Sequence, residues 1–468
     1  MGVTQGSRDE ASSGKGITVS TQSLGEQTVD LLARLARLGC VNDLTADSGG
    51  EERAADLLEE FFAGLPVSIE RVTPHPGRTT LVVTVEGSAP HGDGTPLTLV
   101  GHTDVVPVDE AKWTRDPFGA QIEDGVMWGR GTVDMLHLTA AMAVVTRAVA
   151  RRTQAGEPPA RSLVFVAAAD EEARGGLGVP WIGENRPDAF PWDAALSEMG
   201  GAHIRGRRGG DSVVVVVGEK GAAQRRLHIR GDAGHGSVPL GRTSAVERLA
   251  QVSAALSAAR WPTATDEVWA GFVRAFEFDE MTETSLINGT YEGDYAEFGD
   301  LAAFAHAISH VTVAQTVAHS GGPINVMPSH AILELDIRTL PGVDDDDVDA
   351  AIAAALGDLS EHVTIERLLS EGATASSIDT DLYRAIEAAL TRRYPGVAVV
   401  PVLFPGGTDL RVARRRGGIG YGFGAVDSGA SLGQVYSQLH AHDEHIALVD
   451  VRATAEVLHE VATTYLGA

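Results

Sequence analysis

Short apolar runs and longer segments of helical periodicity alternate along most of the chain. Four runs rich in apolar and β-branched residues are bounded by turn residues, which is typical of buried strands. They cover residues 81–85, 97–100, 162–166 and 211–217. Residues 24–38 and 138–150 instead repeat apolar positions every three or four residues, which predicts amphipathic helices. The alternation predicts an α/β sheet covered by helices.

The pattern changes after residue 220. Beyond it, alternating strands and amphipathic helices of an α+β unit are predicted. The predicted strands cover residues 224–229, 331–338 and 363–369, and the predicted helices cover 243–259 and 348–356. The stretch 262–320 has no clear periodicity. We therefore expect an α+β unit inserted into the larger α/β domain.

The α/β pattern returns near the C-terminus, with a predicted strand over 397–403 and predicted helices over 382–392 and 449–465. A chain of 468 residues favours about two or three domains. The expected division is a disordered tail over 1–20, a main domain built from 21–220 and 373–468, and an inserted domain over 221–372.

Acidic residues outnumber basic ones. The chain has 37 Lys and Arg against 64 Asp and Glu, which is a formal net charge of −27. This charge repels nucleic-acid phosphates and anionic membrane surfaces, so we expect neither kind of partner. The single cysteine, Cys40, excludes an internal disulfide and a cysteine-rich zinc site. No apolar run reaches the roughly 18 residues of a membrane span, and the first residues lack a signal-peptide pattern, so we expect a cytoplasmic protein.

Chemistry-bearing residues follow the predicted strands. His102 and Asp104 stand two apart at the end of one strand and project to the same face, so that one can bind a metal while the other orients it. Asp134 stands where a loop meets the helix over 138–150, which suits a cation ligand or, alternatively, a helix N-cap.

Acidic residues follow two further apolar runs. Asp170, Glu171 and Glu172 come directly after the strand over 162–166, and Glu198 ends another apolar run. Three neighbouring carboxylates at the carboxyl end of a strand repel one another without a cation, although such triplets also occur on surface loops. Two neighbouring carboxylates can act as metal ligand and general base.

A short histidine-rich patch near the C-terminus contains His440, His442 and His445, which cannot all be ligands. With the acids above, it completes a ligand set for two divalent ions, and zinc suits this mixture of imidazole and carboxylate.

The order and context of these blocks resemble the co-catalytic zinc peptidase and amidohydrolase family, which includes aminoacylase, acetylornithine deacetylase, succinyl-diaminopimelate desuccinylase, glutamate carboxypeptidase and several dipeptidases. The resemblance extends from about residue 25 to 465. It rests on Gly101-His-Thr-Asp-Val-Val-Pro107, Trp113 with Asp116-Pro-Phe118, Gly129-Arg-Gly131 with Asp134-Met135, and Asp170-Glu-Glu172. It implies a zinc-peptidase-like catalytic domain with a mixed central sheet flanked by helices, plus an inserted α+β lid or dimerisation domain.

The resemblance also implies two Zn²⁺ ions, with Co²⁺ or Mn²⁺ as replacements. His102 and Glu198 would hold one ion, Glu172 and His440 would hold the other, and Asp134 would bridge both.

Two acidic residues beside these ligands take further roles by the same resemblance. Asp104 would position His102, and Glu171 would be the general base that activates the metal-bridging water. Leu136 stands where the family usually has Lys, and this difference removes none of the five expected metal ligands.

His440 is preferred to His442 because the family pattern is His, two residues, Asn or Asp, then Glu. Only His440, followed by Asp443 and Glu444, fits it.

The inserted unit carries its own matches. Gly234-His235-Gly-Ser237-Val-Pro239 resembles a lid motif whose His235 would stabilise the oxyanion of the tetrahedral intermediate. In dimeric members of the family this histidine comes from the partner chain, which implies a homodimer. Asn325, Arg338, Gly407 and Thr408 fall in blocks that resemble the pocket for a substrate carboxylate, where Arg338 would bind through bidentate hydrogen bonds.

The expected activity is therefore zinc-dependent hydrolysis of an amide or peptide bond next to a free carboxylate, with a small peptide or an N-acyl amino acid as substrate. The sequence leaves dipeptidase, carboxypeptidase and N-acyl amino acid deacylase open. The alternative is a non-catalytic binding protein on the same scaffold. Such a protein typically loses ligands or the base, and all five ligands and Glu171 are present here.

Overall fold

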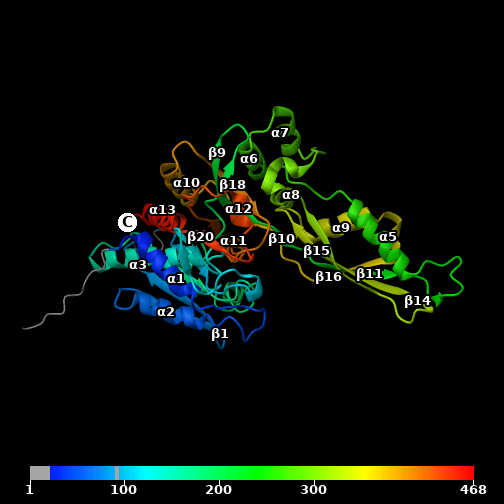
Figure 1. Cartoon of the computed structure of the whole chain (residues 1–468), viewed down its shortest axis with the longest axis horizontal. Helices are drawn as coiled ribbons and strands as arrows, with labels where there is room; N and C mark the ends of the chain where they lie inside the picture. Colours follow the sequence, from blue (N-terminus) through cyan, green and yellow to red (C-terminus); the bar gives the residue numbers. More distant parts are fainter. Residues whose placement is uncertain (1–21, 90–93) are drawn as a thin grey trace, which may run out of the picture.

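The computed structural model describes residues 22–89 and 94–468, and the tail expected over 1–20 lies outside these residues. A mixed sheet of ten strands within the described residues forms the centre of the main domain (Figure 1). Its order is β1 (Ser68–His75), β2 (Arg78–Val85), β6 (Leu163–Ala168), β3 (Leu97–His102), β7 (Ala194–Ser197), β19 (Ile419–Gly422), β9 (Asp211–Glu219) and β17 (Thr374–Ala375). β8 (His203–Arg205) and β18 (Ala398–Phe404) also pair with β9.

The pairings within this sheet confirm the predicted mixed α/β fold. β3 is parallel to both β6 and β7, and β19 is parallel to β7, whereas β1, β2 and β6 pair antiparallel. Helices cover both faces of the sheet, and the central strands are therefore continuously apolar instead of alternating between apolar and polar residues.

Helices cover the two faces of the sheet. On one face they share an apolar core with Leu163 and Phe165 of β6. These helices are α1 (Leu24–Ala36), α3 (Leu136–Gln154), α10 (Asp381–Arg393) and α13 (Leu448–Leu466). On the other face, Val164 and Val166 pack against α4 (Val179–Asn185), and α11 (Leu410–Arg415) lies beside β7 and β19.

Shorter elements complete the main domain. β4 (Gln121–Glu123), β5 (Val126–Trp128) and β20 (His445–Ala447) form a three-stranded sheet. The others are α2 (Glu52–Phe62), α12 (Leu432–Tyr436) and the short helix η1 (Glu110–Lys112). Within the described ranges, none of the helices combines the length and the apolarity that a membrane span requires.

A second sheet forms the extension on the right of Figure 1. Its strands are β10 (Gly221–Ala222), β11 (Arg225–Arg230), β13 (Thr312–Ser320), β15 (His330–Thr339) and β16 (Val363–Arg367). α5 (Ala245–Ala258) and α9 (Asp345–Leu356) pack on it, with η3 (Gly357–His362) following α9. The acidic run before α9 is a helix start, since Asp344 and Asp347 form a reciprocal capping box. At the far tip, β12 (Gly234–His235) pairs with β14 (Val326–Met327).

The stretch 262–320, which the sequence leaves without pattern, divides between the two sheets. Its helices are α6 (Glu267–Ala275), α7 (Glu280–Ile287), η2 (Tyr295–Leu301) and α8 (Ala302–Ser309), and its last part is β13. α6 packs on β18, and a cluster of aromatic rings including Phe272, Phe298 and Phe304 shares a core with Val216 and Val402 of the main sheet. Part of the predicted inserted unit therefore belongs spatially to the main domain.

Candidate metal centre

The candidate ligands converge at one edge of the main sheet. β3 ends at His102, β6 runs into Asp170-Glu171-Glu172, and β7 runs into Glu198. Because these three strands are parallel and adjacent, their carboxyl ends meet at the same edge, where ligands bind in open α/β sheets. Asp134 comes from the loop before α3, and His440 from the loop after α12.

Asp134 lies between the two histidines. Its Oδ1 is 3.2 Å from Nε2 of His102, and its Oδ2 is 3.5 Å from Nε2 of His440. Glu198 Oε2 lies 3.7 Å from Nε2 of His102, and Glu172 Oε2 lies 3.2 Å from Nε2 of His440. Ligands about 2.0–2.2 Å from a tetrahedral zinc lie roughly 3.3–3.6 Å from one another, so these five side chains fit two ions with Asp134 between them.

Asp134 is not a helix N-cap, which was the alternative prediction. Met135 occupies the N-cap position of α3, and no side chain caps the helix there. The peptide bond between Asp134 and Met135 is cis.

The electrostatics of the centre favour a bound cation. Burial and the nearby Asp134 raise the pKa of Glu198 to about 8, and burial likewise raises the pKa of Glu172. Burial opposes ionisation of Asp134 as well, but hydrogen bonds from His102 and His440 hold its pKa well below the usual range. Glu198 Oε2 is buried and has no hydrogen-bond partner among the described residues. Divalent cations would satisfy this crowded carboxylate set.

Asp104 orients His102. Nδ1 of His102 lies 2.9 Å from the carbonyl oxygen of Asp104 and 3.5 Å from its Oδ1. Since a carbonyl can only accept, Nδ1 carries the proton and Nε2 is left free for a metal. The carboxylate of Asp104 also accepts the backbone N–H groups of Glu171 at 3.3 Å and Glu172 at 3.1 Å.

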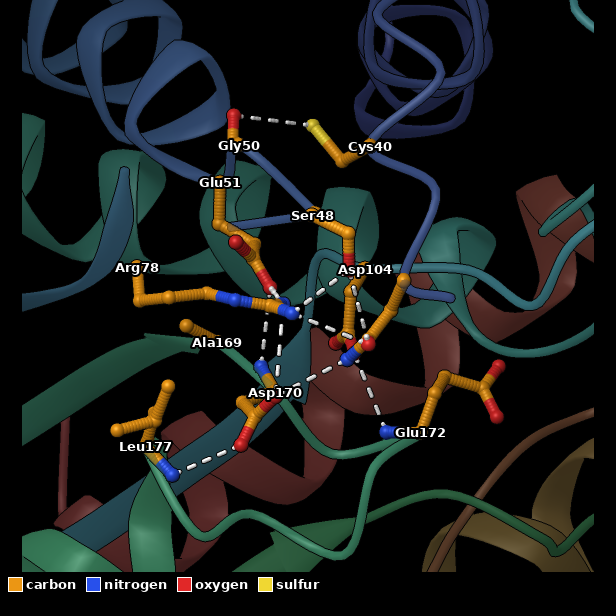
Figure 2. Close-up of polar contacts among 12 residues, drawn as sticks. Cys40, Ser48, Gly50, Glu51, Arg78, Asp104, Ala169, Asp170, Glu172 and Leu177 are labelled. Atoms are coloured by element: carbon orange, nitrogen blue, oxygen red, sulfur yellow. Dashed lines mark hydrogen bonds and ion pairs between the residues drawn. The ribbon is translucent and has the colours of Figure 1, made fainter. Parts of the chain in front are cut away.

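A buried polar network that the sequence reading missed supports Asp104 (Figure 2). Nδ2 of Asn42 donates to Asp104 Oδ2 at 2.8 Å and to Asp170 Oδ1 at 3.1 Å. The guanidinium of Arg78 is fully buried and donates to Glu51 Oε1 at 2.6 Å and to Asn42 Oδ1 at 3.1 Å. The one feature of the sequence that could have indicated this network is Arg78 itself, a charged residue at the start of the apolar strand β2.

Glu444 holds the loop that carries Asp134. Its buried carboxylate accepts backbone N–H groups from Gly131 at 3.0 Å, Val133 at 2.7 Å and Asp134 at 3.1 Å. Arg130 donates to the same carboxylate at 2.7 Å. In the sequence, Glu444 serves only to distinguish His440 from His442, and its contacts with the loop before α3 become visible only in the structure.

Glu171 lies beside the metal centre, but within the described residues its carboxylate forms no ion pair with His102 or His440 like those of the five candidate ligands. One of its carboxylate oxygens lies within 4.8 Å of ligand atoms of His102 and Glu198. Burial and the charge of Glu198 hold its pKa well above the usual range. The side chain lines the cavity in front of the centre, where a general base for an attacking water would stand.

This cavity has a volume of about 450 Å³. Besides the ligands, its wall carries five Lys and Arg side chains, which outnumber the three further acids Glu171, Glu219 and Glu371. The cations are Arg174, Lys220, Arg338, Arg411 and Arg415. Arg338 and Gly407, which the resemblance assigns to a carboxylate pocket, thus both line this cavity. The sequence analysis did not predict the other four cationic side chains at this site.

Thr408 differs from its predicted role. It is buried, and both its backbone N–H and its hydroxyl donate to Glu219, at 2.7 and 2.8 Å. Because these donors are occupied and the side chain does not line the cavity, Thr408 shapes the loop rather than contacting a ligand.

His235 and Asn325 lie far from the metal centre of their own chain. His235 is in β12, and Asn325 precedes β14, at the tip of the second sheet. Arg338 stands near the opposite end of β15, eight residues beyond His330. A strand rises about 3.3 Å per residue, so the two ends are roughly 26 Å apart.

The remaining histidines of the C-terminal patch are separate from the centre. His442 is exposed, and His445 stacks on Trp128 with ring centroids 4.3 Å apart. The side chain that contacts Asp134 and Glu172 is that of His440, in agreement with the choice made from the sequence.

Comparisons with known proteins identify a family and a fold. Residues 98–464 match the family described as peptidase family M20/M25/M40. The chain is 27% identical over 327 residues to a probable carboxypeptidase S-like 2 of Dictyostelium discoideum, in an alignment that covers 68% of this chain and 62% of that relative.

Solved structures share the fold. An M20 family metallo-carboxypeptidase from Sulfolobus solfataricus has a TM-score of 0.69 and 20% identity, covering 94% of this chain and 100% of that one. A Bacillus subtilis protein described as a dinuclear metal binding peptidase from the M20 family has a TM-score of 0.58 and 13% identity, covering 95% of this chain and 99% of that one. The family match extends over most of the chain, and the chain belongs to the peptidase family M20/M25/M40.

Proposed function

We propose that this chain is a hydrolase of amide or peptide bonds next to a free carboxylate, with two Zn²⁺ ions in its active site. The observation that carries the proposal is Asp134, whose two carboxylate oxygens face His102 and His440 separately. A carboxylate in this position would be shared by two ions when they are bound, and two-metal sites are common in hydrolytic enzymes.

Ions held by His102, Asp134, Glu172, Glu198 and His440 would polarise a substrate carbonyl and lower the pKa of a water toward about 7. Glu171 would take a proton from the attacking water and deliver it to the leaving nitrogen as the C–N bond breaks. Its place on the cavity wall, beside His102 and Glu198, supports this role. Asp104 would keep His102 and the Glu171 backbone in position throughout.

The carboxylate of the substrate would bind on the cationic part of the cavity wall. Arg338 reaches the cavity from β15 and lies 3.1 Å from Asp336, which holds its guanidinium in place. Gly407 offers an open backbone on the same wall.

The inserted unit would act as a lid and dimerisation domain, and His235 with Asn325 would serve the active site of a partner chain. Their distance from their own metal centre supports this, as does the apolar surface at the same tip. Its exposed residues are Val238, Leu240, Ile324 and Val326, of which Leu240 and Ile324 are almost fully exposed. Apolar side chains gathered in this way mark an interaction surface. We further propose the cytoplasm as the compartment, because a chain whose single cysteine is Cys40 folds without any internal disulfide.

The test is hydrolysis of dipeptides and N-acyl amino acids by zinc-loaded protein, with metal content measured in parallel and a chelated control. We expect about two zinc ions per chain and release of a free amino acid that the chelator abolishes. Metal-free protein without turnover would overturn the proposal in favour of the non-catalytic scaffold, and turnover that resists chelation would overturn the metal mechanism.

A further inference from the structure

A second cavity of about 240 Å³ adjoins the cavity at the metal centre. The two share a wall of five residues, namely Glu198, Met199, Phe404, Tyr436 and Leu439. Most of the remaining lining of the second cavity is apolar, with Val133, Leu138, Phe423 and Phe304 among it.

The shared wall begins directly at two metal-ligand candidates. Met199 follows Glu198 in the chain, and Leu439 precedes His440. Met199 and His440 have φ angles of 73° and 59°, in the left-handed region that side chains other than Gly rarely adopt. Such backbone strain gathers at ligand-binding sites, and Met is a flexible side chain that can open or close a passage. The second cavity therefore lies next to the metal centre, on the other side of residues that adjoin two of its candidate ligands.

The two cavities differ in charge. Five Lys and Arg side chains line the metal cavity, whereas none lines the second one. Of the acids at the second cavity, Asp450 accepts two hydrogen bonds of 2.7 Å from Ser428, and Glu198 faces His102. Nδ1 of His137 is buried there without a hydrogen-bond partner among the described residues. No Lys or Arg in this lining compensates an anionic guest, and most of the lining is apolar, so the cavity suits an uncharged apolar group.

We propose that the second cavity receives the apolar acyl chain of an N-acyl amino acid, whose carboxylate lies on the cationic wall. This inference rests on the proposed function and chooses among the substrates that it leaves open. The carboxylate belongs to the amine side of the scissile bond and is drawn to the cations, which leaves the acyl side for the apolar cavity. A dipeptide in the same orientation would have to bring its ammonium group to the mostly apolar second cavity, where loss of its hydration is costly.

The volume of the second cavity limits the length of the acyl chain that it can hold. An apolar cavity of about 150 Å³ holds benzene, so one of about 240 Å³ holds roughly six to ten carbon atoms. Hydrolysis of the substrate consumes one water and yields a medium-chain carboxylate and a free amino acid.

The experiment compares N-acetyl, N-butanoyl, N-hexanoyl and N-octanoyl derivatives of one amino acid with zinc-loaded protein. We expect kcat/KM to rise by up to about fourfold for each added methylene, which corresponds to burial of about 0.8 kcal/mol per methylene. A matched pair isolates the ammonium group, since the N-hexanoyl and 2-aminohexanoyl derivatives differ only in that group, and the N-hexanoyl compound should be preferred. A flat or falling series, or preference for the 2-aminohexanoyl compound, would overturn the inference.

A variant places the effect in the cavity. Ala430 lines it, and Ala430→Leu should occupy it and flatten the dependence on chain length while the N-acetyl compound is still cleaved. Ser437→Leu is the matched control, because Ser437 is exposed in the same segment and lines neither cavity. An unchanged dependence in Ala430→Leu would contradict the placement.

Binding of the carboxylate products to wild-type protein by calorimetry keeps the test independent of variant folding and of turnover. Octanoate should bind more tightly than acetate, and equal affinities would overturn the cavity assignment. If octanoate binds tightly but no compound is hydrolysed, the proposed function fails while the apolar site stands. If the N-acetyl compound is the best substrate, the function stands and this inference fails.

Discussion

Neighbouring carboxylates at the metal centre differ in what surrounds them. Glu172 lies 3.2 Å from His440, whereas the carboxylate of Glu171, within the described part of the chain, makes no hydrogen bond and faces the cavity. The backbone N–H groups of both residues donate to Asp104, which fixes the two backbone positions, while Glu171 lies beside His102 and Glu198 rather than against His440. This difference in neighbours is the physical reason for assigning metal binding to one residue and proton transfer to the other.

Glu171→Gln should therefore lower kcat by about 10²–10⁴-fold, because the amide cannot accept the proton of the water. Zinc content should stay at the wild-type value, since Glu171 is not among the five proposed ligands. Steady-state kinetics and metal analysis on the same sample check both statements. Glu184→Gln, an exposed change in α4, is the control, and a Glu171 variant that keeps wild-type turnover would remove the base assignment.

At the scale of elements, the centre depends on segments that contribute no ligand. Asn42 follows α1 and connects the turn after β3, which carries Asp104, with the turn after β6, which carries Asp170. Arg78, at the head of β2, in turn holds Asn42 and Glu51 (Figure 2). The network thus ties three adjacent strands of the main sheet to the residues behind the metal ligands.

Asn42→Ala should leave Asp104 and Asp170 short of a donor and lower kcat about 10–100-fold at saturating zinc. Unfolding stability should fall by about 1–3 kcal/mol. A role in stability alone would lower the melting temperature and leave kcat of the folded enzyme unchanged, so measuring both separates positioning from packing. Asn185→Ala in α4 is the matched control, because Asn185 is exposed and donates only to Trp181.

At the scale of the whole molecule, the inserted unit holds its active-site candidates at opposite ends. Arg338 of β15 lines the metal cavity, whereas His235 lies in β12, which pairs with β14 at the tip on the right of Figure 1. A single rigid chain therefore cannot bring both to one substrate, and a two-fold symmetric dimer that exchanges the tips can do so.

Mixing two inactive variants tests this arrangement. His235→Ala and Glu171→Gln chains, unfolded and refolded together, should regain roughly a quarter of wild-type activity, because half of the dimers are mixed and each has one intact site. Each variant refolded alone is the control. Absence of complementation in mixed dimers that are verified by mass would mean that His235 serves its own chain or no active site.

The local pattern was sufficient for the central strands of the main sheet and for several of the helices that cover it. The strands over 97–100 and 162–166 were predictable because both faces of a central parallel strand are buried and its residues are continuously apolar. Five residues could be selected as candidate ligands because imidazole and carboxylate suit divalent ions and because the blocks around them resemble a known family, namely His102, Asp134, Glu172, Glu198 and His440.

Only the tertiary structure decided which distant residues share a site. It buried Thr408 against Glu219, joined Asn42 to Asp104, and placed Phe304 beside the main sheet although the stretch around it has no periodicity. These contacts join residues tens to hundreds of positions apart, and their energy comes from burial and hydrogen bonding that no local period records. The apolar cavity beside Glu198 likewise forms where several elements meet, whereas His102, Glu172 and Glu198 each follow an apolar run that the sequence by itself determined.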